Sequence, residues 1–192
     1  MEKLPTGVAG VDEAGRGPLA GPVCAAAVIL PDDHGLLLRD SKKLSPNARL
    51  LLSGQIKEIA CSWAVAFASV EEIDQYNILQ ATFMAMRRAV FALTPVPSDA
   101  WIDGNQMPRL EGVIVTPCVK GDDRFDGIAA ASILAKVARD QLMDELALTY
   151  PEYEFLRHKG YPTPLHLEKL RQYGASPIHR RTFAPVRAVL IC

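Results

Sequence analysis

Hydrophobic and polar positions along the first third of the chain predict three strands. Residues 7–15 and 20–30 are β-rich runs joined by a turn rich in Gly and Pro, the pattern of a hairpin with an unusual loop. Residues 63–70 alternate between apolar and polar side chains, which predicts a third strand.

Two helices are predicted between and after these strands. Ser45 followed by Pro46 is typical of a helix start, and the helix is expected to run to about Ala60. Its expected apolar face consists of Leu50, Leu51, Ile56 and Ile59. Residues 78–93 have helical length and composition and stop before a Pro-rich stretch.

The second half predicts two short strands, a long helix and a helical end. Residues 100–102 and 113–119 are short apolar runs, consistent with buried strands. Residues 127–150 form the longest helix candidate, which Pro151 ends, and a short helix is expected near residues 165–173. This order predicts an α/β fold, a mixed β-sheet flanked by helices with a small helical C-terminal cap.

Composition places the chain among soluble globular proteins. With 49% hydrophobic and 22% charged residues, the 192-residue chain is neither disordered nor a coiled coil, and its length predicts a single domain, 1–192, with 151–192 as a cap segment within it. No membrane span or signal peptide is visible. Four scattered cysteines without CxxC spacing suggest neither disulfides nor zinc, which favours a cytoplasmic location.

Charge is distributed unevenly along the chain. Residues 155–192 hold seven basic residues and one acid, a formal charge of +6, and the rest holds 14 basic residues and 21 acids, a charge of -7. A basic face beside an acidic one suits a protein that holds a polyanion next to divalent metal ions. A solvated surface that is merely poor in lysine upstream explains the same asymmetry equally well.

Carboxylates follow three of the predicted strands. Asp12 and Glu13 end the first strand, Asp103 follows a short strand, and Asp122 lies between the last strand and the long helix. Strand ends are where such sheets build sites, and four carboxylates suit a site for two Mg²⁺ ions that hydrolyses a phosphodiester. Alternatively, Asp103 makes only a turn and Asp122 only caps a helix.

A geometric objection concerns the two adjacent acids. Neighbouring side chains of a regular strand point to opposite faces, so Asp12 and Glu13 reach one site only if the strand bends near Gly15.

Several blocks in order resemble the ribonuclease HII family. The first is residues 10–18, Gly-Val-Asp-Glu-Ala-Gly-Arg-Gly-Pro, and the next are Asp-Ser-Lys-Lys-Leu at 40–44, Asp-Gly-Asn at 103–105 and Lys-Gly-Asp at 120–122. Residues 128–140, His-Lys-Gly-Tyr at 158–161 and the closing segment 176–186 are similar too. The matches span nearly the whole chain, and their joint order is specific where any single block is weak.

The resemblance implies a ribonuclease H-like fold and an endonuclease dependent on Mn²⁺ or Mg²⁺. Such an enzyme hydrolyses the RNA strand of RNA-DNA hybrids and nicks duplex DNA on the 5′ side of an embedded ribonucleotide, leaving 5′-phosphate and 3′-hydroxyl ends. Its expected partners are therefore these nucleic acids, in ribonucleotide excision repair and DNA replication. No membrane and no protein partner is indicated, and we expect a monomer.

Residue roles carry over by position. The family's four catalytic, metal-binding acids match Asp12, Glu13, Asp103 and Asp122. The loop that senses the ribose 2′-hydroxyl matches Gly15, Arg16 and Gly17, and the tyrosine that stacks at the RNA-to-DNA junction matches Tyr161. Without the flanking match, Tyr161 reads as an ordinary half-buried tyrosine.

The basic residues leave more alternatives open. Lys42 and Lys43 are candidates for phosphate contacts or simply a solvated turn. Arg180 and Arg181 are either duplex contacts or, as arginines near a C-terminus more often are, exposed. Ser132, Lys136 and Asp140 share one helix face, where the last two are explained by a surface ion pair alone, so these residues are not assigned to the catalytic set. His158 and His179 are expected to make structural hydrogen bonds.

One departure from the family's pattern and two rival interpretations remain. Asp123 follows Asp122 directly and is the substitute ligand if that loop shifts. A ribonuclease HIII-like hybrid nuclease is disfavoured by Arg16, where that family carries lysine. It is also disfavoured because members of that family generally carry an N-terminal substrate-binding domain, and here only eleven residues precede Asp12. A non-catalytic binder of RNA-DNA hybrids has no need of four carboxylates facing a polyanion.

Overall fold

The predicted hairpin is the centre of a five-stranded sheet. The computed structural model describes residues 1–38 and 44–191, and within them the strand order is β3-β2-β1-β4-β5. The strands are β1 (Ala9–Ala14), β2 (Val23–Ile29), β3 (Ser62–Ala68), β4 (Asp99–Asp103) and β5 (Ile114–Cys118). β1, β2 and β3 pair antiparallel, whereas β4 is parallel to both β1 and β5. The mixed sheet flanked by helices confirms the predicted fold class.

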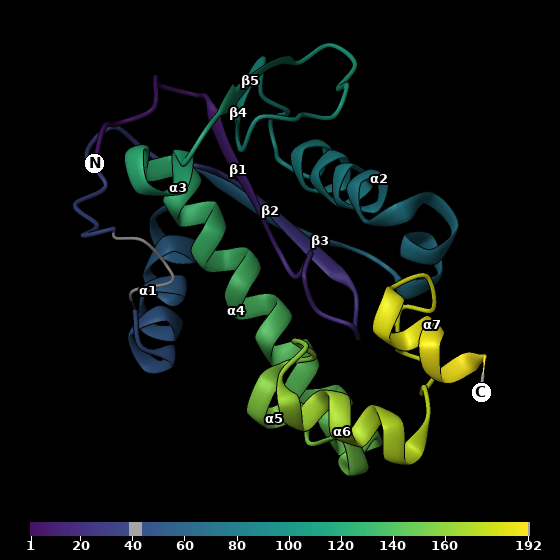
Figure 1. Cartoon of the computed structure of the whole chain (residues 1–192). Helices are drawn as coiled ribbons and strands as arrows, with labels where there is room; N and C mark the ends of the chain where they lie inside the picture. Colours follow the sequence, from purple (N-terminus) through teal and green to yellow (C-terminus); the bar gives the residue numbers. More distant parts are fainter. Residues whose placement is uncertain (39–43, 192) are drawn as a thin grey trace.

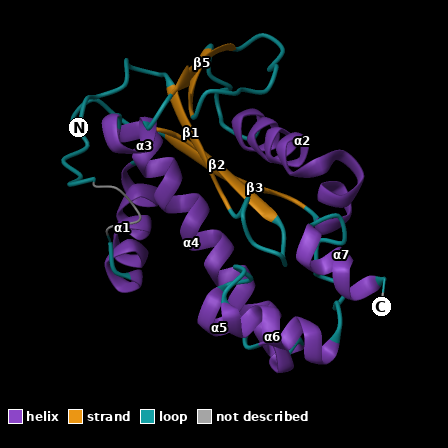
Figure 2. Cartoon of the chain, viewed as in Figure 1, coloured by secondary structure: helices purple, strands orange, loops and turns teal. Residues whose placement is uncertain are grey.

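Helices cover both faces of this sheet (Figures 1 and 2). α2 (Val70–Phe91) packs on one face, and α4 (Asp126–Thr149) with α1 (Pro46–Ile59) packs on the other. β2 lies between these layers, which is why all its residues are buried and its sequence is apolar throughout. Shorter helices follow: α3 (Gly121–Arg124), α5 (Phe155–His158), α6 (Pro164–Tyr173), α7 (Ala184–Leu190) and the 3₁₀ turn Pro151–Tyr153.

The C-terminal segment packs against the far end of α4 (Figure 1). Met143 and Ala147 of α4 form a buried cluster with Tyr153 and Phe155, and Ala20 from the β1–β2 connection completes it. The loop of the first hairpin is therefore packed between the end of the long helix and the last forty residues. Among the helices formed by residues 1–38 and 44–191, none is long and apolar enough to cross a membrane.

Two sequence predictions about α2 and β5 are wrong in detail. α2 begins at Val70, eight residues earlier than expected, because Ser69 and Glu72 form a reciprocal capping box. Asn77, with φ 68°, then kinks the helix close to the predicted start. β5 is not buried but lies at the edge of the sheet, where only Cys118 is covered.

The apolar face of α1 is also displaced from the prediction. Its start is as expected, with the Ser45 hydroxyl accepting from the Ala48 N–H at 3.2 Å. Of the four residues predicted to pack inward only Ile56 is buried, and Leu52 joins it. Leu50, Leu51 and Ile59 face outward. The face of α1 that packs against α4 is set by tertiary packing and not by the apolar pattern of the helix alone.

The closest approach between layers lies where β1 crosses the start of α4. A Cβ atom added at Gly10 would overlap the carbonyl group of Gly127, so glycine is required at position 10 for backbone contact between strand and helix. This contact places the first turn of α4 directly behind the amino-terminal half of β1.

We predict that Gly10→Ala destabilises the protein by about 3 kcal/mol, because backbone atoms on both sides must separate. The matched control is Gly54→Ala in α1, an exposed helical position where the added methyl meets nothing within 4 Å. That control should stabilise by about 0.5–1 kcal/mol. Urea denaturation of both variants measures the difference, and equal stabilities would contradict the close approach.

Candidate active site

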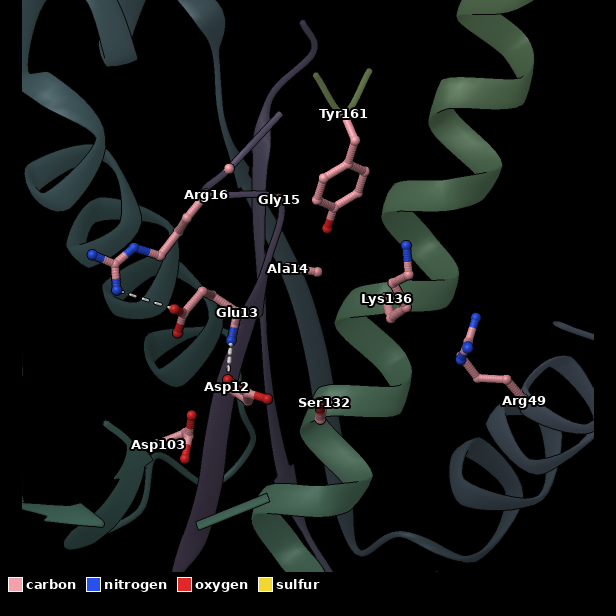
Figure 3. A pocket seen from close by; sticks show the side chains of 11 residues that line it. Asp12, Glu13, Ala14, Gly15, Arg16, Arg49, Asp103, Ser132, Lys136 and Tyr161 are labelled. Carbon is pink, nitrogen blue, oxygen red and sulfur yellow. Dashed lines mark hydrogen bonds and ion pairs between the residues drawn. The ribbon is translucent and has the colours of Figure 1, made fainter. Parts of the chain in front are cut away.

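Three of the four predicted carboxylates surround one pocket. Asp12, Glu13 and Asp103 line a cavity of about 300 Å³ together with residues of the β1–β2 connection, α1, α4 and the α5–α6 loop (Figure 3). β1 and β4 are parallel neighbours, so their carboxyl ends meet at the same edge of the sheet.

Adjacent Asp12 and Glu13 both reach this pocket although β1 is regular. Val11 packs on the α2 side of the sheet and Ala14 on the α4 side, so Glu13 and Asp12 extend from opposite faces of the strand. The pairing of β1 with β4 stops at Val11, which leaves the strand's end open to the pocket from both faces. The bend expected from the sequence is not needed, because β1 stays in register with β2 through Ala14.

The pocket opposes ionisation of its acids. Burial raises the pKa of Asp12 well above its ordinary value, and the charges of Glu13 and Asp103 raise it further. Hydrogen bonds from the Ser132 side chain and from the Glu13 N–H, at 2.7 Å, act in the other direction. Burial also raises the pKa of Glu13, against which the Arg16 guanidinium 3.3 Å away acts. Crowded carboxylates of this kind are stabilised when a cation joins them.

Asp122 lies beside the pocket but does not line it. The Asp103 carboxylate accepts from the Gly121 N–H at 2.7 Å, which ties the end of β4 to the start of α3. Asp122 is the next residue and is 4% exposed, whereas Asp123 is exposed. The structure thus brings three predicted acids together and places the fourth one residue from the backbone group that Asp103 binds.

The donor set is of the type that hard divalent cations prefer. Asp12, Glu13 and Asp103 offer carboxylate oxygens in one pocket, and their mutual repulsion is of the kind that Mg²⁺ or Mn²⁺ relieves. As placed, no three His, Cys, Asp or Glu side chains within residues 1–38 and 44–191 form a group that could hold a metal ion. It is the oxygen chemistry and the crowding of these carboxylates, and not a preformed cluster, that fit a divalent cation.

The Gly15–Gly17 loop forms another wall of the pocket, and a buried arginine holds it. Gly15 has φ +97°, a conformation that favours glycine, and the loop turns there out of β1. Arg180 donates to the carbonyls of Gly15 at 2.6 Å and Arg16 at 3.0 Å. The expectation that Arg180 is exposed is wrong, since it is 0% exposed, while Arg181 is exposed as expected.

This clamp orients the loop's amide groups. In a trans peptide the N–H points opposite to the preceding C=O. Because the carbonyls of Gly15 and Arg16 point at Arg180, the N–H groups of Arg16 and Gly17 point away from it. The loop thereby presents two backbone donors on the side away from the core.

Tyr161 closes the pocket from the α5–α6 loop (Figure 3). Its ring edge lies 3.8 Å from where a Cβ of Gly17 would be, so the ring stands beside the loop. The side chain is 37% exposed and Lys136 Nζ lies 5.5 Å from the ring centroid. Tyr161 therefore combines an exposed ring with a fixed place beside the loop.

Sequence reasoning did not assign three further pocket residues to the site. Ser132 and Lys136 reach the pocket from α4, and Arg49 reaches it from α1. Lys136 donates to Asp140 at 2.7 Å, so the expected ion pair exists, yet Lys136 also lines the cavity. The four-residue spacing of Ser132, Lys136 and Asp140 was the available signal. Lys42 and Lys43 lie outside the described residues.

Comparisons with known proteins show which family this chain resembles. The family model described as Ribonuclease HII matches residues 9–186. A Ribonuclease HII from Janthinobacterium sp. (strain Marseille) is 57% identical over 187 residues, which cover 95% of this chain and 87% of that protein.

Solved structures show the same fold. The ribonuclease H2 from Pyrococcus horikoshii OT3 is 29% identical with a TM-score of 0.79, covering 95% of this chain and 96% of that one. The ribonuclease HII of Archaeoglobus fulgidus, solved in complex with PCNA, is 26% identical with a TM-score of 0.77, covering 94% and 93%.

Together, the fold, the carboxylate pocket and these likenesses define a ribonuclease H, an enzyme that acts on RNA-DNA hybrids. Within this class, the chain belongs to the ribonuclease HII family.

We predict that Asp103→Asn stabilises the metal-free protein at pH 7 by about 1 kcal/mol. A carboxyl group whose pKa is raised in the folded state destabilises that state as the pH rises above the unfolded pKa of 3.8. Removing the charge of Asp103 reverses part of this destabilisation at Asp12. Asparagine keeps an acceptor for the Gly121 N–H.

Urea denaturation with chelator present measures this effect. The control is Asp99→Asn at the other end of β4, which removes an equal charge away from the pocket. A loss of stability in Asp103→Asn, or an equal gain in both variants, would contradict the repulsion.

Proposed function

We propose that this ribonuclease H hydrolyses the RNA strand of RNA-DNA hybrids and nicks duplex DNA on the 5′ side of an embedded ribonucleotide. The products carry 5′-phosphate and 3′-hydroxyl ends. The observation that carries the proposal is that two features occur together in one pocket. Three carboxylates form one side, and a backbone loop with an exposed tyrosine forms the other.

The proposed cofactors are Mg²⁺ or Mn²⁺ ions held by Asp12, Glu13, Asp103 and Asp122. Bound there, the ions supply an activated water and stabilise the leaving oxygen of an in-line displacement. The protein's own part is to hold the carboxylates: the Ser132 side chain bonds Asp12, and Arg16 bonds Glu13. Asp122 takes its place through the Asp103–Gly121 link between β4 and α3.

The loop of Gly15, Arg16 and Gly17 is the proposed reader of the ribose 2′-hydroxyl, the group that distinguishes RNA from DNA at a given site. Its two outward N–H groups are donors that such a hydroxyl can accept from, and glycine lets the backbone approach a sugar closely. The hydroxyl serves recognition here and is not the nucleophile.

Tyr161 is the proposed selector of the RNA-to-DNA junction. An aromatic ring packed against the next sugar penalises a second 2′-hydroxyl there, so a junction is preferred over a uniform RNA tract. The place of this ring beside the Gly15–Gly17 loop supports the recognition of two neighbouring sugars by these two groups.

Basic residues are proposed to bind phosphates around the cut. Lys136 and Arg49 line the same pocket as the acids. Lys42 and Lys43 extend this role to the segment before α1. In this proposal, residues 1–192 act as one catalytic domain and as a monomer.

The deciding experiment is cleavage of a DNA duplex that contains one ribonucleotide, beside an all-DNA duplex. Each is incubated with Mg²⁺, with Mn²⁺ and with chelator. We expect a metal-dependent nick on the 5′ side of the ribonucleotide with a 3′-hydroxyl end, and no cut in the control. A 2′,3′-cyclic phosphate end would contradict the mechanism, because it would make the 2′-hydroxyl the nucleophile.

Two other outcomes favour other functions. Binding without a cut in either metal would indicate a non-catalytic hybrid binder. Cleavage confined to longer RNA tracts would favour a ribonuclease HIII-like specificity.

The assignment of Asp122 rather than Asp123 has a matched test. We expect Asp122→Asn to lower kcat at least about 100-fold, because one carboxylate of the metal-binding set is lost. Asp123→Asn should change kcat less than about twofold, since this neighbour is exposed. Both variants remove one charge in the same four-residue helix, so a reversed result would move the ligand to Asp123.

A further inference from the structure

Three buried histidines lie beneath the backbone that carries Tyr161. His158 ends α5, His166 lies in the first turn of α6, and His179 lies in the segment before α7. His166 and His179 are 0% exposed and His158 is 6% exposed. The His158 and His166 rings stack with centroids 4.5 Å apart. The site described above uses none of these imidazoles.

The hydrogen bonds assign a single tautomer to each ring. Ser176 N–H donates to His179 Nδ1 at 3.0 Å, so that nitrogen carries no proton and His179 Nε2 carries it. His179 Nε2–H therefore donates to His166 Nε2 at 3.0 Å, which leaves the proton of His166 on Nδ1. His166 Nδ1–H in turn donates to the carbonyl of Tyr161 at 2.9 Å.

The third ring follows the same logic. Gly160 N–H donates to His158 Nδ1 at 3.2 Å, and His158 Nε2–H donates to the Tyr153 carbonyl at 3.0 Å. Every ring nitrogen of the three histidines thus has a protein partner, which leaves none for a metal ion or for proton transfer to substrate. Burial lowers the pKa of His166 to about 4 and of His179 to about 3, in accord with neutral rings.

We propose that His166 is a positioning residue that sets the place of the Tyr161 ring and so contributes to selection of the RNA-to-DNA junction. This inference rests on the role given to Tyr161 in the proposed function. His166 does not touch substrate. It holds the peptide from which the ring is presented.

The backbone is the right place for such control. The Tyr161 side chain is 37% exposed, with the cationic groups of Lys136 and Arg139 near one part of its ring, so the peptide that presents the ring also decides where it stands. The residue's N–H donates to the His158 carbonyl at 2.9 Å, and its carbonyl accepts from Thr163 N–H at 2.8 Å and from His166. Of these bonds, the one to His166 is the contact made by a side chain, so a substitution can remove it alone.

The hydrogen bonds from Ser176 to His179 and from His179 to His166 keep the proton of His166 on Nδ1. A proton on His166 Nε2 would oppose the His179 Nε2–H, and with it the Ser176 bond to His179. The Ser176 N–H at one end therefore fixes the donor and acceptor of every hydrogen bond in this series, and the Tyr161 carbonyl accepts the last one.

Two substitutions of His166 break this series of hydrogen bonds at different points. Asn places an amide where Nδ1 lies, so His166→Asn keeps a donor for the Tyr161 carbonyl and loses the partner of His179. Gln reaches the place of Nε2, so His166→Gln keeps an acceptor for His179 and loses the donor to Tyr161. The control Tyr153→Phe removes a hydroxyl that donates to the Gly174 carbonyl, on a ring whose centroid lies 4.9 Å from that of His179.

The measurement is the ratio of kcat/KM on a duplex with one ribonucleotide to kcat/KM on a uniform RNA-DNA hybrid. We expect His166→Gln to lower this ratio about tenfold, and His166→Asn and Tyr153→Phe to keep it within about twofold. Thermal stability should follow another order, because His166→Asn leaves a buried imidazole N–H unpaired. A purely structural role would make selectivity follow stability.

A double substitution tests whether the effect passes through Tyr161. Tyr161→Ala should itself lower the ratio, and adding His166→Gln to Tyr161→Ala should lower it no further. Additive effects, or equal ratios in His166→Gln and the wild type, would overturn the positioning role while leaving that of Tyr161 intact. A Tyr161→Ala variant with unchanged ratio would overturn the role of Tyr161 and this inference with it.

Discussion

Two buried guanidinium groups hold the connection on which the pocket depends. The chain leaves β1 just after its acids, and its carbonyls in the following turn do not continue the strand pairing. Arg139 of α4 donates to Ala20, Pro22 and Lys159, and Arg180 donates to Gly15, Arg16, Gly21 and Pro22. Both are fully buried, and burial lowers the pKa of both. Charge-assisted hydrogen bonds to several carbonyls offset the cost of burying these cations.

This arrangement makes the pocket a product of the whole chain. Arg180 binds carbonyls more than 150 positions earlier, and Arg139 also binds Lys159, close to Tyr161. The loop of Gly15 therefore takes its shape only when α4 and the C-terminal segment are both in place. The hydrogen bonds of the three histidines lead to the Tyr161 carbonyl, in the loop between α5 and α6. Both proposed sugar-reading groups are thus held from behind by side chains that face away from the substrate.

The sequence predicted what local signals encode. The hairpin, the start of α1 at Ser45 and the end of α4 at Pro151 depend on turn residues, a cap and a proline. The burial of Arg180 could not be predicted, because its partners are carbonyls distant in the sequence. The exposure of β5 depends on its place at the sheet edge, which its own residues do not show. The acids were identified through strand ends and family resemblance, whereas their sharing of a pocket depends on where the β1–β4 pairing stops.

The distribution of charge within the pocket matches the chemistry proposed for it. Arg16 is paired with Glu13, while Lys136 is paired with Asp140 rather than with the sheet's acids. Lys136 lies one turn along α4 from Ser132, whose side chain bonds Asp12, so acidic and basic groups occupy successive turns, about 5 Å apart along the helix axis. In the proposed function, the phosphodiester lies between them, with its anionic oxygens toward Lys136 and the scissile bond toward the carboxylates. Since Lys136 does not neutralise the acids, their repulsion remains available to drive cation binding.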